Sequence, residues 1–257
     1  MSRVDRMSNY KWLVVFRKEV RDGLRDHRSL FSALTFCWLG PLLVGVLWKQ
    51  PTALVLLPAF LIITAFTGAM NIANDTMAGE RERGSLEPLL MNPVALSDLV
   101  FGKFLATCAF SLGCVVLTLL FALAVLFATP LGGRMHPGAL LWMFAVAVPL
   151  VPFAAGIDLL ICTFAQTPKE GNSYLSVALL APMLIGILAE FFPIRLEAAI
   201  AVVPLLGQQR MLSALTRGEI PHLAWLLLSG ACMALIGALA VTATARLLRH
   251  ERVVFGR

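Results

Sequence analysis

Four charged residues of alternating sign stand together in the first third of the chain: Glu80, Arg81, Glu82 and Arg83, directly before Gly84. Two neighbouring carboxylates can divide the work of a general acid and a general base. These four lie in a polar segment between two long apolar runs. Charges in such a setting are more typical of a solvated surface that docks on another protein, so we expect no catalysis from them.

Asp158 is a different kind of candidate, because it lies inside an apolar run, eight residues before Gln166. Eight helical residues span about 12 Å, which places the carboxylate well inside a membrane, where a charge costs about 2.5–3.5 kcal/mol. It either faces a translocation cavity and meets a cation or polar substrate, or it is a structural carboxylate, protonated or bonded to a neighbouring helix. The other pathway candidates are Glu190 near the outer interface and Asn71, Asn74 and Asp75 at the inner mouth.

No catalytic motif accompanies these side chains. The nucleotide-binding pattern G-x-x-x-x-G-K-[ST] is absent, since Lys103 is followed by Phe104, and G-x-S-x-G and H-E-x-x-H are absent too. The four histidines are dispersed, and the five cysteines lie in apolar runs without C-x-x-C spacing. We predict a chain that is not an enzyme, with no catalytic residue, no metal site and no cofactor of its own, whose cysteines act as small apolar residues.

The composition indicates the solvent around the chain. Of 257 residues, 59% are apolar and 14% charged, and the mean hydropathy is +0.83, whereas soluble domains are about 25% charged. A conventional soluble enzyme, a disordered tail and a disulfide-stapled secreted module are excluded. Crossing a bilayer takes about 20 apolar residues. The sequence therefore predicts an all-α integral membrane protein, one transmembrane domain over residues 1–257, with six spans near 30–47, 52–74, 99–129, 138–165, 174–193 and 222–247.

Basic residues indicate the orientation. With the N-terminus inside, 16 of the 21 Lys and Arg residues lie on the inner side and five on the outer side, which predicts two cytoplasmic termini. The net charge of +6 then reflects topology and not nucleic-acid binding. Residues 11–28 are predicted to form an interfacial amphipathic helix; the alternative is a basic flank that only sets topology. Its apolar stripe is Trp12, Phe16, Val20 and Leu24.

Small residues at four-residue spacing predict two close helix contacts, because small side chains let helices approach in lipid. We expect packing within one subunit, with a dimer interface as the alternative. The stripes are Ala65, Ala69 and Ala73 in the second span, and Gly230, Ala234, Ala238 and Thr242 in the sixth.

Two connecting segments have unusual composition. Residues 194–221 are too apolar for a water-exposed loop, and Pro204 and the polar residues 207–210 interrupt them too much for a seventh span. Residues 76–98 are predicted to be cytoplasmic. There Ser85 can cap a short helix that has Glu87 in its first turn and three leucines on one side. Charges beside exposed leucines suit docking on a soluble protein.

The stretch AGERERGSLEPLL after Asp75, followed by Pro93 and by Gly102 and Lys103 at the next span, resembles the permease subunits of type 2 ABC transporters, a family with NatB-like exporter subunits. FRKEVRDGLRDHRSL, KEGNSYLS, LTRGEI and the basic tail extend the resemblance in order along the chain. It implies the six-span exporter fold in a bacterial cytoplasmic membrane, with residues 194–221 forming re-entrant helices in the outer leaflet.

The resemblance also implies partners. Two copies of this permease would pair in the lipid bilayer and bind two copies of a cytoplasmic ABC ATPase, which holds ATP and Mg. The substrate stays open. The ATPase-coupling role would fall on Gly79, Glu80, Arg81, Glu82, Arg83, Gly84, Ser85, Leu86, Glu87, Leu89 and Leu90, with a smaller contact at Lys169 and Glu170.

Two further function classes remain. One is a secondary transporter or channel that needs no ATPase and uses Asp158 as its ion site. The other is a membrane-embedded assembly factor that binds soluble partners and transports nothing.

Overall fold

The computed structural model describes the whole chain except residues 1–10, 51–52, 86–94, 136–137, 192–197 and 250–257. The described residues are helical or irregular, with no strand among them, which confirms the all-α prediction. The helices are α2 (Lys11–Arg25), α3 (His27–Val46), α4 (Leu56–Asn74), α5 (Glu80–Glu82), α7 (Leu96–Ala128), α8 (Ala139–Ala147), α9 (Leu150–Cys162), α10 (Pro168–Phe191), α11 (Ala198–Val202), α12 (Leu206–Thr216) and α13 (Leu223–Leu247).

Five stretches of the described chain are long and apolar enough to cross a membrane: Ser29–Val46, Ala53–Glu82, Leu96–Ala128, Ala139–Cys162 and Leu223–Leu247. They overlap five of the six expected spans and make this a multi-pass membrane protein. The remaining expected span, 174–193, overlaps α10, a helix of 24 residues that is not among the five. The span expected at 138–165 is two helices, and it breaks beside Pro149, which has no N–H to continue the hydrogen-bond ladder.

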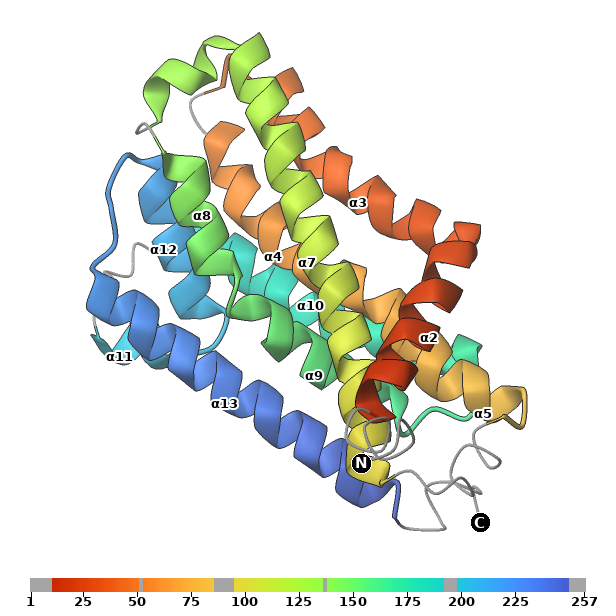
Figure 1. Ribbon diagram of the computed structural model, residues 1–257. Coiled ribbons are helices and arrows are strands. Elements are labelled where there is room, and N and C mark those ends of the chain that lie inside the picture. The colour runs from red at the N-terminus through yellow and green to blue at the C-terminus, as the bar shows by residue number, and fades with distance from the viewer. Residues whose placement is uncertain (1–10, 51–52, 86–94, 136–137, 192–197, 250–257) are drawn as a thin grey trace, which may run out of the picture.

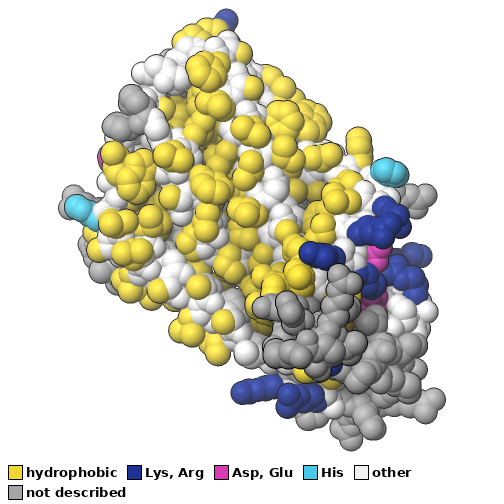
Figure 2. Space-filling model, in the orientation of Figure 1, with side chains coloured by type: hydrophobic (Ala, Val, Ile, Leu, Met, Phe, Trp, Pro, Cys, Tyr) yellow, Lys and Arg dark blue, Asp and Glu magenta, His cyan; other side chains and the backbone are white. Residues whose placement is uncertain are grey.

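Two helices are longer than a bilayer requires. The 33 residues of α7 extend about 50 Å, and the 30-residue stretch Ala53–Glu82, which contains α4, extends about 45 Å, against a hydrocarbon core of about 30 Å. In Figure 1 the C-terminal end of α4, the start of α7 and α2 lie together at the lower right, near the end of α13. Figure 2 shows Lys and Arg gathered there, beside a broad apolar surface. We call this region, made of the C-terminal end of α4, the start of α7 and α2, the charged end.

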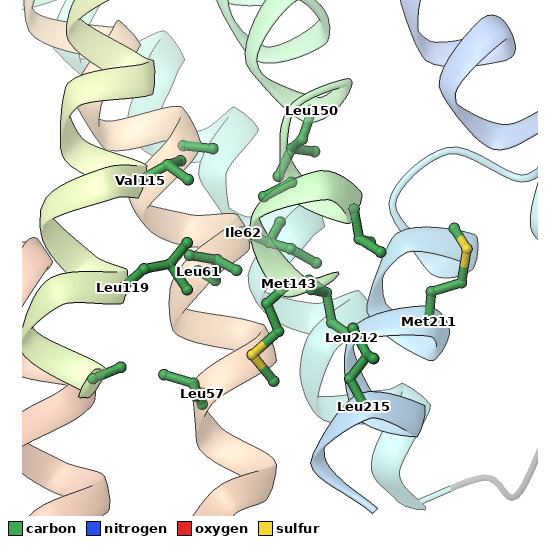
Figure 3. Close-up of a cluster of buried hydrophobic side chains, with 14 of the residues drawn as sticks. Leu57, Leu61, Ile62, Val115, Leu119, Met143, Leu150, Met211, Leu212 and Leu215 are labelled. Carbon is green, nitrogen blue, oxygen red and sulfur yellow. The ribbon is translucent and has the colours of Figure 1, made fainter. Parts of the chain in front are cut away.

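A continuous apolar core joins the long helices to the shorter ones. Leu57, Leu61 and Ile62 of α4 meet Val115 and Leu119 of α7, and the same cluster includes residues of α8, α9 and α12 (Figure 3). Burial of large side chains at about 25 cal/mol per Å² holds a soluble core together. In lipid the gain comes from close packing instead, so the small residues at the helix crossings matter.

The two small-residue stripes have opposite outcomes. Ala65, Ala69 and Ala73 are fully buried, as expected. The prediction that the stripe in α13 packs within the chain is wrong, because Ala234, Ala238 and Thr242 are exposed. The buried face of α13 instead carries Ser229, Met233, Gly237, Ala240 and Thr244. At the crossing with α9, a Cβ on Gly156 would lie 2.8 Å from the Gly237 carbonyl oxygen.

The segment 194–221 contains two short helices, α11 and α12, joined through Leu205 at a positive φ of 65°. All residues from Gly207 to Thr216 are buried, against α4, α8, α10 and α13. The polar run that was expected to interrupt this segment is therefore part of a protein-enclosed helix.

Candidate functional site

A π turn (Asp75–Gly79) follows α4 without a break and leads into α5. π turns shift the register of the residues that follow, and they occur frequently at functional sites. Here the side chains of Glu80 and Arg81 contact different neighbours: Glu80 bonds to Lys103, and Arg81 bonds to the Thr163 carbonyl oxygen. We call residues 74–85 the α4 extension, and its contacts connect four other elements of the charged end.

Lys103 is the centre of the first group of contacts. Its side chain is 1% exposed, and its Nζ lies 2.6 Å from Glu80 Oε2 and 3.0 Å from Glu19 Oε1. It also donates to the Thr76 carbonyl oxygen at 2.7 Å, within the π turn. Lys18 completes the group, 3.2 Å from Glu19 Oε1 and hydrogen-bonded to Glu80 Oε1. These contacts join α2, the α4 extension and α7.

We call Lys18, Glu19, Glu80 and Lys103 the four-charge cluster. It is electrically balanced, with two cations and two carboxylates. Burial lowers the pKa of Lys18, but its hydrogen bond to Glu80 and the charges of Glu19 and Glu80 outweigh this, so the pKa is raised. Removing one partner of a buried pair costs about 3–5 kcal/mol, because a buried charge is left uncompensated. The cluster therefore favours one arrangement of the three elements.

Arg81 makes the second group of contacts. Its Nη2 donates to the Thr163 carbonyl oxygen at 3.0 Å, and its Nη1 donates to the Ala165 carbonyl oxygen. These carbonyls follow the end of α9, where the last turn of a helix lacks backbone donors and has partial negative charge. The guanidinium thus caps α9 from the α4 extension.

Asn74 connects the extension to α10. Its Nδ2 lies 2.9 Å from the Pro168 carbonyl oxygen and 2.9 Å from Asn172 Oδ1. A Cβ on Gly171 would lie 2.0 Å from Asn74 Oδ1, so only glycine fits this contact. The structure therefore brings together the two segments expected to couple to an ATPase, around residues 79–85 and around Lys169 and Glu170.

In the second of these segments Lys169 is exposed. The Glu170 Oε2 atom accepts the Gln166 N–H at 2.7 Å, and Tyr174 donates its hydroxyl to Oε1.

Gly84 ends the extension in a left-handed conformation, with a φ of 65°. The Ser85 N–H bonds to the Glu80 carbonyl at 3.0 Å, and the Gly84 N–H bonds to the Arg81 carbonyl at 3.0 Å, which is the Schellman pattern of a helix C-terminus. The Ser85 hydroxyl also donates to the Glu80 carbonyl oxygen. Ser85 thus closes the preceding helix. The short helix expected after it, with Leu86, Glu87, Leu89 and Leu90, lies outside the described residues.

The expectation that the alternating charges are all solvated is wrong for Glu80, which is 3% exposed, and for Arg81, which is half-buried. It holds for Glu82 and Arg83. Arg83 forms an exposed ion pair with Asp75, 2.9 Å between Nη1 and Oδ1. The alternation has a structural reason: successive residues of a helical turn face different sides, and two of these sides are occupied by protein.

The predicted pathway residues do not form one site. Asn71 donates to Ser32 Oγ at 2.7 Å, which connects α4 to α3. Asp158 is buried in α9, and its Oδ2 has no hydrogen-bond partner among the described residues. The side chain of Glu190 lies outside the described part. Among the described residues, no group of three His, Cys, Asp or Glu side chains is suited to hold a metal ion.

Sequence reasoning missed the contributions of Lys18, Glu19 and Lys103. Glu19 lies on the packed face of α2 with Val15 and Gly23, while Leu24 of the predicted stripe is exposed. Lys103 was visible only as a lysine at the start of a span. A lysine beside an apolar run can extend its charge to the membrane surface or pair with a buried carboxylate, and the sequence does not identify Glu80 as a partner.

Comparison with known proteins accords with this architecture. The family model described as ABC-2 family transporter protein matches residues 48–229, which include the α4 extension and Lys103. The chain is also 28% identical over 211 residues to the ABC transporter permease protein NatB of Bacillus subtilis (strain 168). That alignment covers 77% of this chain and 54% of NatB, so the chain spans about half the length of the curated relative it matches. The chain belongs to the ABC-2 family of transporter proteins, as a transmembrane permease.

Proposed function

We propose that this chain is the membrane subunit of an ABC exporter, driven by a separate cytoplasmic ATPase that carries ATP and Mg. The observation that supports this most directly is the α4 extension. It continues beyond the apolar part of α4, exposes Glu82 and Arg83, and contacts α2, α7, α9 and α10 through buried or half-buried side chains. A partner that pushed on its exposed side would act on all four helices.

In this mechanism two copies of the permease pair and two ATPases bind beneath them. ATP binding brings the ATPases together, and residues 79–90 pass that motion to the spans, with a smaller contact at Lys169 and Glu170. The cavity between the permeases then changes from inward-facing to outward-facing. These residues transmit force and perform no chemistry.

The orientation proposed with this function places the charged end and both termini in the cytoplasm of a bacterial cell. All six predicted helices then cross the membrane, α10 included, and α11 and α12 form the re-entrant outer segment. α2 lies at the inner membrane surface. A cysteine at Glu82 should react with a membrane-impermeant maleimide only in inverted vesicles, and reaction in intact spheroplasts would contradict this orientation.

The docking role is tested by replacing the two exposed charges of the extension together with three leucines of the segment that follows it. We expect Glu82→Ala and Arg83→Ala, combined with serine at Leu86, Leu89 and Leu90, to abolish the ATPase activity that depends on the permease. Membrane insertion should be unchanged, because no described buried contact is lost. A complex that still assembles and hydrolyses ATP like the wild type would exclude this docking segment.

One observation favours the alternative function, a secondary transporter or channel that needs no ATPase. A buried carboxylate oxygen without a described partner, Asp158 Oδ2, is what an ion site would contain. That alternative predicts ion flux into proteoliposomes that hold the permease alone, and loss of this flux in Asp158→Asn. Flux that requires both an ATPase and ATP supports the exporter instead.

A further inference from the structure

α2, α4 and α7 approach one another unusually closely at the charged end. A Cβ on Gly102 of α7 would lie 2.7 Å from the Trp12 carbonyl oxygen of α2. A Cβ on Gly23 of α2 would lie 2.6 Å from Ile72 Cδ1 of α4 and 2.8 Å from Phe110 Cζ of α7. The three helices therefore meet through glycines, and at Gly102 the backbone of α2 leaves no room for a methyl group.

The same pair α4 and α7 is also joined deeper in the bundle. A Cβ on Gly68 would lie 2.8 Å from Cys114 Cβ, and Ser111 Oγ donates to the Ala65 carbonyl oxygen at 2.7 Å. Interfaces packed this tightly change between discrete arrangements and do not deform continuously. The packing alone thus favours joint motion of α4 and α7.

The four-charge cluster adds a specific connection at the point where force would enter. Lys103 of α7 bonds to Glu19 of α2, and to Glu80 and the Thr76 carbonyl of the α4 extension, and all three side chains are nearly inaccessible to solvent. Moving any one of these elements away from the others would expose or isolate a buried charge.

The contacts with α10 are of a different kind. They include the Asn74 hydrogen bonds to Pro168 and Asn172, the close approach of Gly171 to Asn74, and apolar packing of Met77 and Leu175 in one buried cluster, so none of them pairs two charges. A hydrogen bond between neutral groups that can exchange with water has a small net stabilising effect. Separating the extension from α10 therefore isolates no charge, whereas separating it from α7 isolates Lys103 and Glu80.

We propose that α2, α7 and the α4 extension move as one unit during the transport cycle, that Lys103 is the positioning residue that holds this unit together, and that the unit moves against α10. This inference rests on the proposed function, since an ATPase supplies the motion. It assigns Lys103, Glu80 and Glu19 a role in transmission that is separate from docking.

The first test removes the connection while keeping the charge balanced. In Glu80→Gln/Lys103→Met, Lys18 and Glu19 still pair, so no buried charge is left alone. We expect the double variant to bind the ATPase in wild-type amounts while ATPase stimulation by the permease falls at least tenfold. Full stimulation would overturn the proposal. Equal losses of binding and stimulation would overturn it too, by showing a purely structural cluster.

The second test fixes one interface at a time. In a chain whose five native cysteines are replaced, Trp12→Cys/Phe101→Cys allows a short bis-methanethiosulfonate reagent to join α2 to α7 through two reducible disulfides. The rings of Trp12 and Phe101 are 5.7 Å apart between centroids. Asn74→Cys/Asn172→Cys ties the extension to α10. Each crosslinked complex is compared with the same variant before crosslinking and after reductive release.

We expect the α2–α7 crosslink to leave stimulated ATPase activity within twofold and the Asn74–Asn172 crosslink to reduce it at least tenfold, reversibly. Inhibition by the first crosslink, or tolerance of the second, would overturn the single moving unit. Failure of the proposed function would give a different result: no ATPase would copurify with the wild-type chain, and the wild-type chain would not stimulate ATP hydrolysis by any ATPase.

Discussion

Two parts of this protein bury polar side chains, and they do so in opposite ways. At the charged end, each member of the four-charge cluster lies against an opposite charge. In α12, Gln209 is fully buried, yet neither Oε1 nor Nε2 has a hydrogen-bond partner among the described residues, and Gln208 Oε1 has none either. Gln208 Nε2 does reach Ser229 Oγ at 3.2 Å.

This difference separates two uses of buried polarity. Partnered charges fix the relative positions of helices, because any displacement isolates a charge. Buried amides without partners destabilise the arrangement in which they are found, by about 1–3 kcal/mol each. The buried charges of the charged end thus stabilise one arrangement of its helices, whereas the buried amides of α12 contribute no such stabilisation through contacts with the described residues.

The largest expected effect is at Lys103. Lys103→Met leaves the cluster with one lysine for two buried carboxylates, and we expect a loss of about 3–5 kcal/mol in the free energy of unfolding. Thermal unfolding of the purified chain in detergent measures it. The balanced double variant Glu80→Gln/Lys103→Met should recover most of the loss. A single variant as stable as the wild type would remove the basis of the comparison.

The next effect concerns packing in the same helix. Gly102→Ala places a methyl group against the Trp12 carbonyl and Val15, so we expect about 1–3 kcal/mol of destabilisation. Gly113→Ala is the matched control, because nothing lies within 4 Å of its Cβ position. It should be neutral or stabilising, since alanine favours helix more than glycine does. Equal unfolding midpoints for the two variants would argue against close contact of α2 and α7.

The amides of α12 should respond in the opposite direction from the cluster. Gln209→Met removes an unpartnered amide of similar shape, and we expect stability to rise by about 1 kcal/mol. Gln208→Met loses the bond to Ser229 and should gain less. If Gln209→Met instead unfolds at a lower temperature, Gln209 has a partner in the membrane and the two regions are alike.

The smallest effect is at the surface of the extension. Arg83→Gln breaks the ion pair with Asp75, whose two side chains are 57% and 42% exposed. Exposed pairs contribute about 0–1 kcal/mol, so the unfolding midpoint should change little. At high salt the change should be smaller still, because salt screens the pair. A loss comparable to that of Lys103→Met would show that exposure does not decide the role of charges here.

Much of the fold was predictable from the sequence, because apolar length is a local property. Helices lie over each of the six predicted segments, and the stripe at Ala65, Ala69 and Ala73 is buried. The stripe that failed, in α13, is as regular as the one that succeeded. Apolar faces toward lipid and toward protein have similar composition, since lipid is as apolar as leucine, so periodicity alone could not identify the packed face.

The candidate site was predictable only in outline. The sequence located the charged segment before Gly84, and the structure places Glu82 and Arg83 on its surface. The sequence did not distinguish Glu82 and Arg83 from Glu80 and Arg81. The π turn at Asp75–Gly79 and the position of α7 decide which side of the helical turn packs against protein. A π turn has no reliable signature in a single sequence, as it depends on what the surrounding helices stabilise.

The amino-acid sequence by itself determined that the chain is a helical membrane protein and which segments carry its charges. Each of these follows from the free energy of transferring short segments out of water. The tertiary structure decided which charges became partners. Lys18, Glu19, Glu80 and Lys103 are brought together from three elements, and a buried charge is tolerated only where folding supplies an opposite one.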